Sequence, residues 1–328
     1  MSLRTTLTPN RPGPLVVYTL LSLALVAACE KQETQAPKSH HDSVSRADEL
    51  AATQGTREEM RAIAQGFADA FDALGFGDVD GAVKSFSEDI VWETRGGDER
   101  SVKGREELHA FFDASGRKIG VARVFLTDDD VVISQGVRVD QSRGAGFVAI
   151  GHINGGEITE VQEFRTSAPS DSKGPSLPGE TEVIKEYGDE VNQALAESLH
   201  IAWSKRDWAT IEGSLTRDVV YHDEASGETT QGFDAYKRWF EGFTGPFPDM
   251  SFDIEESWTA GDYVIVKGRT RGTQTAKYGE LEATNNSIEL EGLDIFRFES
   301  GAVAEMWRYH DAAGIMAQLT AGAEKPAS

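Results

Sequence analysis

Residues 77–92 read GDVDGAVKSFSEDIVW and residues 206–221 read RDWATIEGSLTRDVVY, and the two stretches align without a gap. Both have aspartate at the second and thirteenth positions, and both end in an aromatic residue. Further matches at nearly the same spacing are Gly104 with Gly232 and Phe111-Phe112 with Trp239-Phe240, and near the end of each copy residues 156–160 match residues 301–305. Self-similarity at a near-constant offset indicates a duplicated structural unit. The sequence therefore predicts two related domains, at residues 57–167 and 182–322.

Each predicted domain begins with helical patterns and continues with strands. Apolar residues recur every three or four positions along one stripe; the stripes are Met60, Ile63, Phe67, Phe71 and Leu74, and then Ile184, Tyr187, Val191, Leu195 and Ala202. Two shorter helical patterns follow in each copy. Runs of β-branched and aromatic residues then predict strands at 121–126, 131–137, 146–150 and 158–164, and at 251–257, 263–270, 287–297 and 302–309. Helices followed by strands predict an α+β fold with helices on one face of a sheet.

The first 28 residues have the layout of a signal peptide. Arg4 and Arg11 supply positive charge, and residues 15–28 form the apolar run LVVYTLLSLALVAA. A membrane-spanning helix needs about 20 apolar residues, so this run is too short to be a permanent anchor. Residues 25–29, LVAAC, resemble the bacterial lipobox, which implies cleavage before Cys29 and acylation of its thiol. Because Cys29 is the only cysteine, the chain has no internal disulfide; an ordinary signal peptide with a free thiol is the alternative.

Several segments outside the two domains are polar. Residues 29–55 predict a flexible tether, residues 168–181 a linker, and residues 323–328 a tail. The formal net charge of −23 argues against nucleic acid as a partner. The expected location is the cell envelope, with the lipid on Cys29 in a membrane. Glu30 is not the aspartate that marks inner-membrane retention in some bacteria, which favours the outer membrane, facing the periplasm or the exterior.

The second copy carries a recognisable set of motifs, above all residues 291–301, EGLDIFRFESG, followed by Glu305-Met306-Trp307. It resembles the SnoaL-like polyketide cyclases, also described as ester cyclases, of the nuclear-transport-factor-2-like superfamily. The first copy is similar to the same group, less closely. The resemblance implies two tandem cone-shaped domains, each with three N-terminal helices packed on a strongly curved, mostly antiparallel sheet. It also implies a pocket for a small-molecule ligand, no cofactor, and pairing of domains or of two copies through the sheets.

The last strand of the second copy departs from the family pattern Glu-His-Trp-Asp. Met306 stands in place of the histidine and Arg308 in place of the acid–base aspartate. A guanidinium group stays protonated near neutral pH, so it cannot take a proton from carbon. In one interpretation Arg308 points into the pocket, toward His222 or Asp294, and binds a carboxylate or enolate. In the other, Arg308 and Asp294 form a buried structural ion pair.

In the first copy, the same alignment places Glu163 at the position of the family acid. A glutamate in a hydrophobic pocket can have a raised pKa and act as a general acid or base. The alternative is a carboxylate at the solvated rim of the sheet. Trp92 and Glu93, on the first strand of that domain, are weaker candidates for the same pocket.

Three functions remain open at this stage. The chain can be a lipid-anchored binding protein for a small apolar or anionic molecule, without cyclase activity in the second domain. It can be a cofactor-free cyclase, isomerase or lyase that uses Glu163. It can also be an interaction scaffold. No nucleotide-binding, zinc-protease or serine-hydrolase motif occurs, so we expect neither a metal nor a cofactor.

Overall fold

A computed structural model describes residues 46–96, 99–115, 118–127, 129–140, 143–166 and 181–321. The predicted signal peptide, Cys29, nearly all of the predicted linker and the predicted tail lie outside these residues. Residues 46–321 belong to one compact unit. Among the described residues, no helix combines the length and the apolar character needed to cross a membrane.

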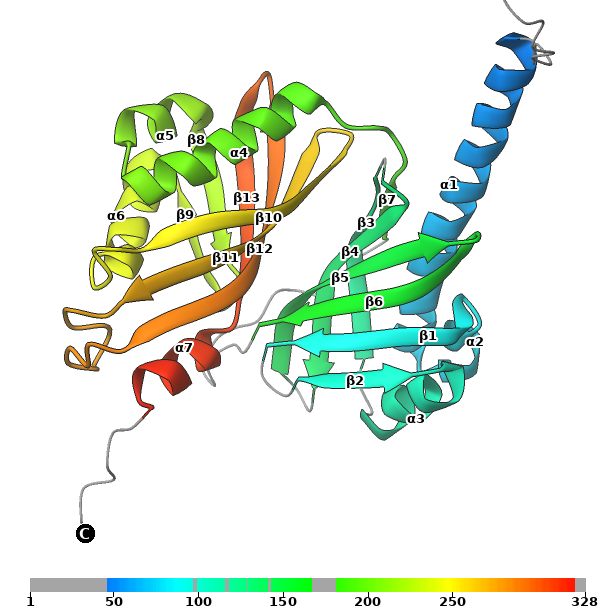
Figure 1. Ribbon diagram of the computed structural model, residues 1–328, viewed down its shortest axis with the longest axis horizontal. Coiled ribbons are helices and arrows are strands. Elements are labelled where there is room, and N and C mark those ends of the chain that lie inside the picture. The colour runs from blue at the N-terminus through cyan, green and yellow to red at the C-terminus, as the bar shows by residue number, and fades with distance from the viewer. Residues whose placement is uncertain are drawn as a thin grey trace, which may run out of the picture. The chain divides into compact units, whose positions relative to one another are not determined.

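The first domain consists of helices packed on one face of a seven-stranded sheet (Figure 1). Its elements are α1 (Arg46–Phe76), α2 (Val79–Val83), β1 (Phe86–Arg95), β2 (Arg100–Lys103), α3 (Arg105–Ser115), β3 (Lys118–Leu126), β4 (Val131–Asp140), β5 (Arg143–Asn154) and β6 (Glu157–Arg165). The strand order is β2-β1-β6-β5-β4-β3-β7, in which β7 is Glu182–Ile184. The pairs β1–β6 and β3–β7 are parallel, and the other neighbouring strands of this sheet are antiparallel.

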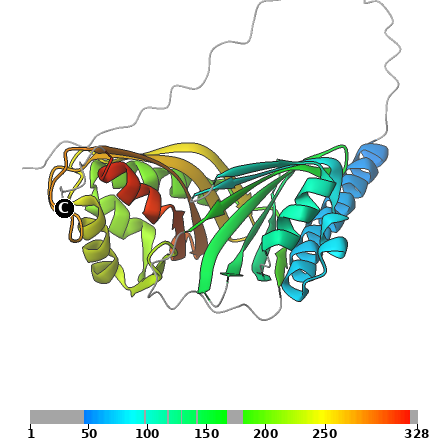
Figure 2. The ribbon, with the colours of Figure 1, turned by 90° about the horizontal axis from the view of Figure 1, so that it is seen from below.

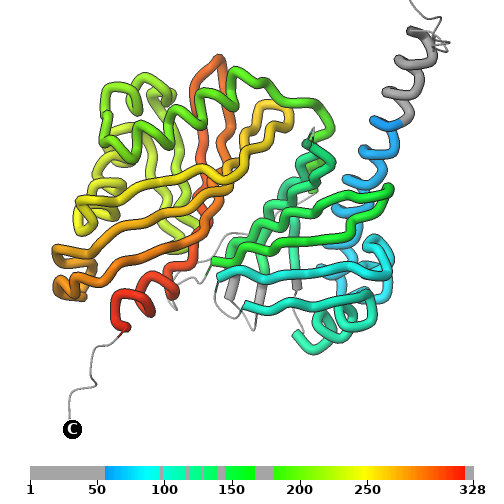
Figure 3. The backbone as a smooth tube through the Cα atoms, viewed as in Figure 1, coloured from blue at the N-terminus to red at the C-terminus, as the bar shows by residue number. Residues whose placement is uncertain are grey.

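The second domain repeats this arrangement around a six-stranded sheet, as the backbone trace in Figure 3 shows. Its elements are α4 (Glu190–Lys205), α5 (Trp208–Ser214), β8 (Leu215–Asp223), β9 (Glu228–Gln231), α6 (Phe233–Thr244), β10 (Ser251–Ala260), β11 (Tyr263–Thr273), β12 (Ser287–Glu299), β13 (Ala302–His310) and α7 (Ala312–Leu319). The strand order β10-β11-β12-β13-β8-β9 matches that of the first sheet without β7, and β8–β13 is its parallel pair. The predicted fold class, two tandem α+β domains with mostly antiparallel sheets, is confirmed.

The repeated residues have the same structural task in both domains. Asp78 and Asp207 are the N-caps of α2 and α5, and each side chain accepts a hydrogen bond from a backbone N–H of the first turn. Gly104 and Gly232 precede α3 and α6 with φ of +86° and +81°. Glycine adopts this conformation without the steric cost that other residues meet. The matching sequence positions thus keep the same helix starts in both copies.

Three clusters of buried side chains stabilise the fold. One lies between the helices and sheet of the first domain, and a second lies in the same place in the second domain. The third takes side chains from both sheets, including Phe125 and Tyr263, whose ring centroids are 5.1 Å apart. Helices cover the opposite face of each sheet in Figure 2. Gln135 Nε2 also donates a hydrogen bond of 3.0 Å to the hydroxyl of Tyr309, so the contact between the sheets is partly polar.

The structure differs from the predicted element boundaries in three places. Helix α1 begins at Arg46, so the predicted tether extends too far. Residues 182–184 form β7 on the first sheet, and α4 starts only after Asp189, whose side chain accepts a 2.7 Å hydrogen bond from Val191 N. The predicted helical stripe from Ile184 was therefore wrong in its first turn. Phe86 and Leu215 begin strands β1 and β8, which interrupt the predicted run of helices.

Candidate functional site

The interior of the second domain contains Arg308, which is 6% exposed. Side chains of strand β13 alternate between its two faces: Met306 and Arg308 face the helices, while Trp307 joins the cluster between the sheets. Arg308 Nη1 donates to both carboxylate oxygens of Asp294, at 3.1 and 2.9 Å. Arg308 Nη2 donates to Thr270 Oγ1 at 2.9 Å. The buried ion pair considered from the sequence is therefore present, and two of the three guanidinium nitrogens are occupied.

Asp294 also contacts a histidine that the sequence did not single out. His200 Nε2 lies 3.0 Å from Asp294 Oδ2, and His200 Nδ1 lies 2.9 Å from the carbonyl oxygen of Ala196. Burial alone raises the pKa of Asp294, but the charge of Arg308 and the bond from His200 outweigh burial, so the pKa is lowered. A carboxylate held ionised by two such partners is a poor proton acceptor. Asp294 therefore positions Arg308.

An aromatic cage surrounds the remaining guanidinium nitrogen, Nε. The cage encloses a cavity of about 10 Å³ lined by Trp203, Tyr221, Tyr236, Trp239, Phe240, Phe243, Phe252 and Arg308. Two buried groups of the residues that line this cavity, Arg308 Nε and the Tyr221 hydroxyl, have no hydrogen-bond partner within the described part of the chain. The Tyr236 hydroxyl interacts with the indole N–H of Trp203, which can only donate, so the hydroxyl keeps its own hydrogen for another acceptor. The volume of the cavity is close to that of a single water-sized probe. The cage is thus narrow and unusually rich in unused hydrogen-bond donors.

The two tyrosines of the cage act as donors. Burial raises the pKa of Tyr221 and of Tyr236 well above the usual value of 10.0. Both hydroxyls therefore keep their protons at neutral pH, and each can donate to an acceptor in the cavity. The ring centroids of Tyr221 and Tyr236 are 5.2 Å apart, and both side chains line the same cavity.

An open groove of about 690 Å³ lies directly outside the cage. Its lining includes Asp223, Thr230, Gln231, Arg238, Trp239, Phe243, Tyr278 and His310. Trp239 and Phe243 line both the groove and the cage, with their rings stacked at a centroid distance of 5.6 Å and an interplanar angle of 10°. These two rings therefore border both the solvent-accessible groove and the cage.

His310 and Asp223 form a pair of titratable side chains in this groove. His310 Nδ1 lies 3.6 Å from Asp223 Oδ1, and His310 is only 7% exposed. Asp223 accepts hydrogen bonds from Ala225 N at 3.2 Å and from Ser226 Oγ at 2.5 Å. Burial lowers the pKa of His310 from its usual 6.5, so the imidazole is neutral near neutral pH. Strand alternation puts His310 on the same face of β13 as Arg308, whereas no sequence pattern selects Asp223.

His222 lies on the other face of the sheet, so of the two residues toward which Arg308 was predicted to point, Asp294 is its partner and His222 is not. His222 Nε2 is 3.0 Å from Glu305 Oε1, and the imidazole ring stacks on Trp307 at 5.5 Å. The parallel register of β8 and β13 pairs His222 with Trp307, which faces away from Arg308. Met306 is 1% exposed and packs in the core of the domain.

Glu163 occupies the corresponding position in the first domain, with 2% exposure. Arg165 Nε and Nη2 donate to its two oxygens at 2.7 and 2.8 Å, and Trp92 Nε1 donates at 2.9 Å. Burial raises the pKa of Glu163, but Arg165 and Trp92 together outweigh burial and lower it. The prediction of a raised pKa was wrong, because it ignored Arg165. The solvated-rim alternative was also wrong, because the carboxylate is buried.

Trp92 and Glu93 do not share a pocket. Trp92 is fully buried among the aromatic rings of the first core, at centroid distances of 5.1 Å from Phe112 and 5.6 Å from Phe86. Glu93 points to the opposite face of β1 and pairs with Arg95 at 2.6 Å. Adjacent residues of a strand face opposite sides, so the prediction that both line one pocket was wrong.

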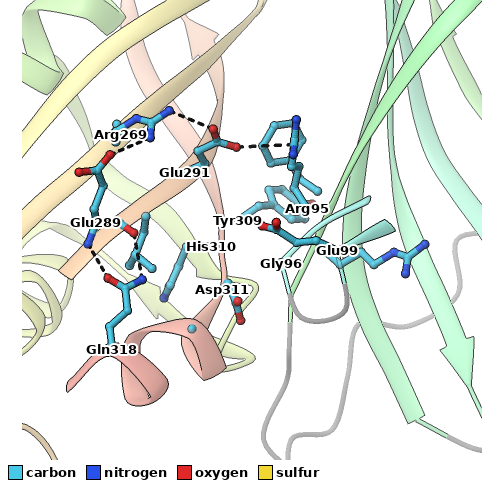
Figure 4. A pocket seen from close by; sticks show the side chains of 14 residues that line it. Arg95, Gly96, Glu99, Arg269, Glu289, Glu291, Tyr309, His310, Asp311 and Gln318 are labelled. Atoms are coloured by element: carbon cyan, nitrogen blue, oxygen red, sulfur yellow. Dashed lines mark hydrogen bonds and ion pairs between the residues drawn. The ribbon is translucent and has the colours of Figure 1, made fainter. Parts of the chain in front are cut away.

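A further pocket of about 430 Å³ takes residues from both domains (Figure 4). Arg269 lies between the carboxylates of Glu289 and Glu291, at 2.8 and 3.0 Å. The second oxygen of Glu291 is 4.0 Å from Arg95. Since these guanidinium groups are already neutralised by carboxylates, the pocket favours no particular charge in a ligand. We therefore place the candidate site in the cage and groove of the second domain.

Comparisons with known proteins match each half of the chain separately. The sequence profile of the SnoaL-like polyketide cyclase family matches residues 193–319, and the profile of the SnoaL-like domain family matches residues 48–161. No curated protein sequence matches the chain.

Similar solved structures each cover about one domain. AclR from Streptomyces galilaeus is 20% identical, covering 39% of this chain and 94% of AclR with a TM-score of 0.36. A SnoaL-like protein from Jannaschia sp. CCS1 is 18% identical, covering 40% of this chain and 94% of that protein with a TM-score of 0.39. IdmH from Streptomyces antibioticus is 21% identical, covering 39% of this chain and 97% of IdmH with a TM-score of 0.36.

Proposed function

Because the chain carries two SnoaL-like domains in tandem, we propose that it is a lipid-anchored protein of the cell envelope whose second domain binds a small apolar molecule with a carbonyl or enolate oxygen. The oxygen lies in the aromatic cage and the body of the molecule lies in the groove. Arg308 stands where the family keeps its acid, so the second domain does not use the family position for proton transfer. The first domain, whose buried carboxylate is held by Arg165, has a supporting role.

The observation that carries this proposal is the convergence on one cavity of three polar groups with an unused donor hydrogen: Arg308 Nε and the hydroxyls of Tyr221 and Tyr236. A buried donor without an acceptor costs about 1–3 kcal/mol, so a bound acceptor would stabilise the site. Arg308 Nε can only donate, and the two tyrosine hydroxyls are held protonated by their raised pKa values. Three donors in one place suit the oxygen of a ketone or enolate, on which negative charge accumulates.

The shapes of cage and groove also limit the ligand. A cavity of about 10 Å³ accommodates a single oxygen atom and no ring. The rest of the molecule must therefore occupy the groove, against Trp239, Phe243 and Tyr278. Aromatic side chains favour a flat apolar body through stacking. A bicyclic aromatic ketone combines these properties.

A pair of matched probes tests the binding proposal. We would measure binding of 1-indanone and of indane, the same molecule without its oxygen, to the protein beginning after Cys29 by tryptophan fluorescence. A hydrogen bond of about 1–1.5 kcal/mol predicts roughly 5- to 10-fold tighter binding of the ketone. Tyr236→Phe should reduce that preference. Tyr187→Phe, the same change at a side chain 39% exposed and outside the cage, should retain it.

Two results would contradict the binding proposal. Equal affinities for indanone and indane would show that the donors do not recognise the oxygen. Absence of binding by either probe at millimolar concentration would remove the groove as an aromatic site and shift weight to the scaffold function.

The lipid anchor is a separate part of the proposal and rests on the lipobox-like residues 25–29. We expect full-length protein expressed in a bacterium to incorporate an alkynyl fatty acid and to partition into detergent, with membrane fractionation placing it in the outer membrane. Cys29→Ser should abolish the label and release the protein from the membrane. Unlabelled wild-type protein whose sequence starts at residue 29 with a free thiol would exclude lipidation.

A further inference from the structure

Beyond ligand binding, we propose that His310, supported by Asp223, removes a proton from the carbon next to the ligand carbonyl, so that the second domain catalyses enolisation of a ketone. This inference rests on the proposed function, because it requires the carbonyl oxygen to lie in the cage. It assigns a general base to a domain in which Arg308 occupies the position of the family's acid–base aspartate.

The arrangement of β13 brings the base and the cage together. Arg308 and His310 are on the same face of the strand with one residue between them, which separates them by about 7 Å. Arg308 lines the cage and His310 lines the adjoining groove. Phe243 borders both spaces and lies 5.7 Å from the imidazole, centroid to centroid. A ketone whose oxygen approaches Arg308 Nε therefore extends its neighbouring carbons toward His310.

His310 has the surroundings of a general base. Within the described residues its Nδ1 has no hydrogen-bond partner, and the nearest carboxylate oxygen, on Asp223, is 3.6 Å away. The charged groups that act on it are Asp223 from β8, Asp294 from β12, Arg308 from its own strand and Asp311 from the turn before α7. Burial lowers the pKa of His310, which leaves a neutral imidazole able to accept a proton at neutral pH. The Asp223 carboxylate then stabilises the imidazolium that forms.

The buried carboxylates Asp294 and Glu163 are unsuited to accept a proton from carbon. Asp294 accepts from both Arg308 and His200, and Glu163 accepts from Arg165 and Trp92. The pKa values of both carboxyl groups are lowered, so each would hold a proton only in acid. His310 is in contrast neutral and borders an open groove.

The proposed step balances without a co-reactant. The bond between the α-carbon and its hydrogen breaks, and the proton passes to a ring nitrogen of His310. The electron pair of that bond forms the carbon–carbon double bond of the enolate, while the carbonyl π pair moves to oxygen. Tyr221, Tyr236 and Arg308 Nε can donate to the resulting oxyanion, as preorganised donors do in other enzymes. Return of the proton to the same carbon regenerates the ketone.

Hydrogen exchange in heavy water measures this step directly. We would incubate 1-indanone, the ketone of the binding test, with the protein beginning after Cys29 in D₂O and follow loss of the α-proton signal by NMR. The wild type should accelerate exchange over buffer. His310→Gln should lower the protein-catalysed rate about 100-fold or more while indanone binding is retained, and Asp223→Asn should lower it about 10-fold. His222→Gln, a histidine on the opposite face of the sheet, should leave the rate unchanged.

The pH profile provides a readout that does not depend on the folding of a variant. The wild-type rate should rise with pH through one ionisation below 6.5 and then become level, as expected for a base whose pKa is lowered from that value. Wild-type exchange equal to that of buffer, despite ketone-selective binding, would overturn the proton-transfer proposal and leave the binding proposal intact. Wild-type exchange retained in His310→Gln would overturn the assignment of the base. Loss of ketone-selective binding would overturn both.

Discussion

The two domains have the same strand order but opposite charges at the same buried position. The first domain has Glu163 on β6, and the second has Arg308 at the matching place on β13. Glu163 accepts hydrogen bonds from Arg165, two residues further along its strand, and from Trp92. Arg308 donates across to Asp294 on β12. A duplicated fold has thus retained a buried ion pair in each interior, with an exchange of the charge at the matching position and with the partner taken from the same strand in the first domain and from the neighbouring strand in the second.

The consequence of this exchange is that one interior is filled and the other retains unused donors. In the first domain, Trp92 packs between phenylalanine rings and donates its indole hydrogen to Glu163. Tyr221 stands at the matching position of β8, and within the described residues its hydroxyl has no partner. A fold can therefore convert a structural interior into a binding site by changing which polar group faces the cavity, with the strand order retained.

The largest expected effect is the loss of stability on replacing Arg308 with methionine. Asp294 would retain only His200 as a partner, and a buried carboxylate that loses its main counter-charge costs about 3–5 kcal/mol. We expect the free energy of unfolding of the second domain to fall by this amount in urea titration of the protein beginning after Cys29. Domain-specific tryptophan signals would assign the transition, since Trp203, Trp208, Trp239, Trp258 and Trp307 are all in the second domain.

A double variant serves as the control for this prediction. Arg308→Met combined with Asp294→Leu removes both charges, so it should recover much of the loss caused by Arg308→Met alone. Equal stability of Arg308→Met and wild type would show that the ion pair contributes nothing, and the comparison between the two interiors would lose its energetic basis.

Lowering the pH is expected to reduce the free energy of unfolding by less than Arg308→Met does, because a protonated carboxyl group can still form hydrogen bonds. The pKa values of Asp294 and Glu163 are lowered from 3.8 and 4.5. The stability that comes from a lowered folded-state pKa is fully present above the unfolded value and is lost as pH falls through the folded value. We therefore expect these two groups to leave the free energy of unfolding, measured in urea, unchanged between pH 6 and 5. Below about pH 4.5 their protonation should lower it.

Variants that remove one buried carboxylate should distinguish the acid dependence of stability of the two domains. Asp294→Asn should flatten the acid dependence of the second domain and leave that of the first, while Glu163→Gln should do the reverse. Parallel acid dependence in all variants would mean that surface carboxylates, of which the chain has many, determine acid unfolding.

The sequence was sufficient to predict those features of the two domains that follow from matching positions in the two copies. The alignment of residues 77–92 with 206–221 predicted two related domains, and period-2 alternation placed Arg308 and Met306 on one face. The same rule could have paired Glu163 with Arg165, since residues two apart on a strand share a face. Attention to the family position alone led instead to a predicted proton-transfer acid.

The remaining features depend on strand register and on packing between distant segments. The direction of His222 follows from the parallel register of β8 with β13, and the bond from Trp92 to Glu163 crosses from β1 to β6. Neither register is visible in a hydropathy pattern. His200 reaches Asp294 from helix α4, 94 residues away in the chain. The cage combines side chains of helices and strands, so its size could not be obtained from sequence.

The smallest expected effect gives the sharpest comparison, because it changes one matched position in both domains. Trp92→Phe removes the indole donor to a buried carboxylate and leaves a space, so we expect it to lower the free energy of unfolding of the first domain by about 2–3 kcal/mol. Tyr221→Phe removes a hydroxyl that has no partner in the described part of the chain. Its loss should change the stability of the second domain by less than about 0.5 kcal/mol, or raise it slightly, because no hydrogen bond is lost. Urea titrations of both variants in the protein beginning after Cys29 measure the contrast. If Tyr221→Phe costs as much as Trp92→Phe, the tyrosine hydroxyl is already satisfied within the protein, and the cage has no free donors to offer a ligand.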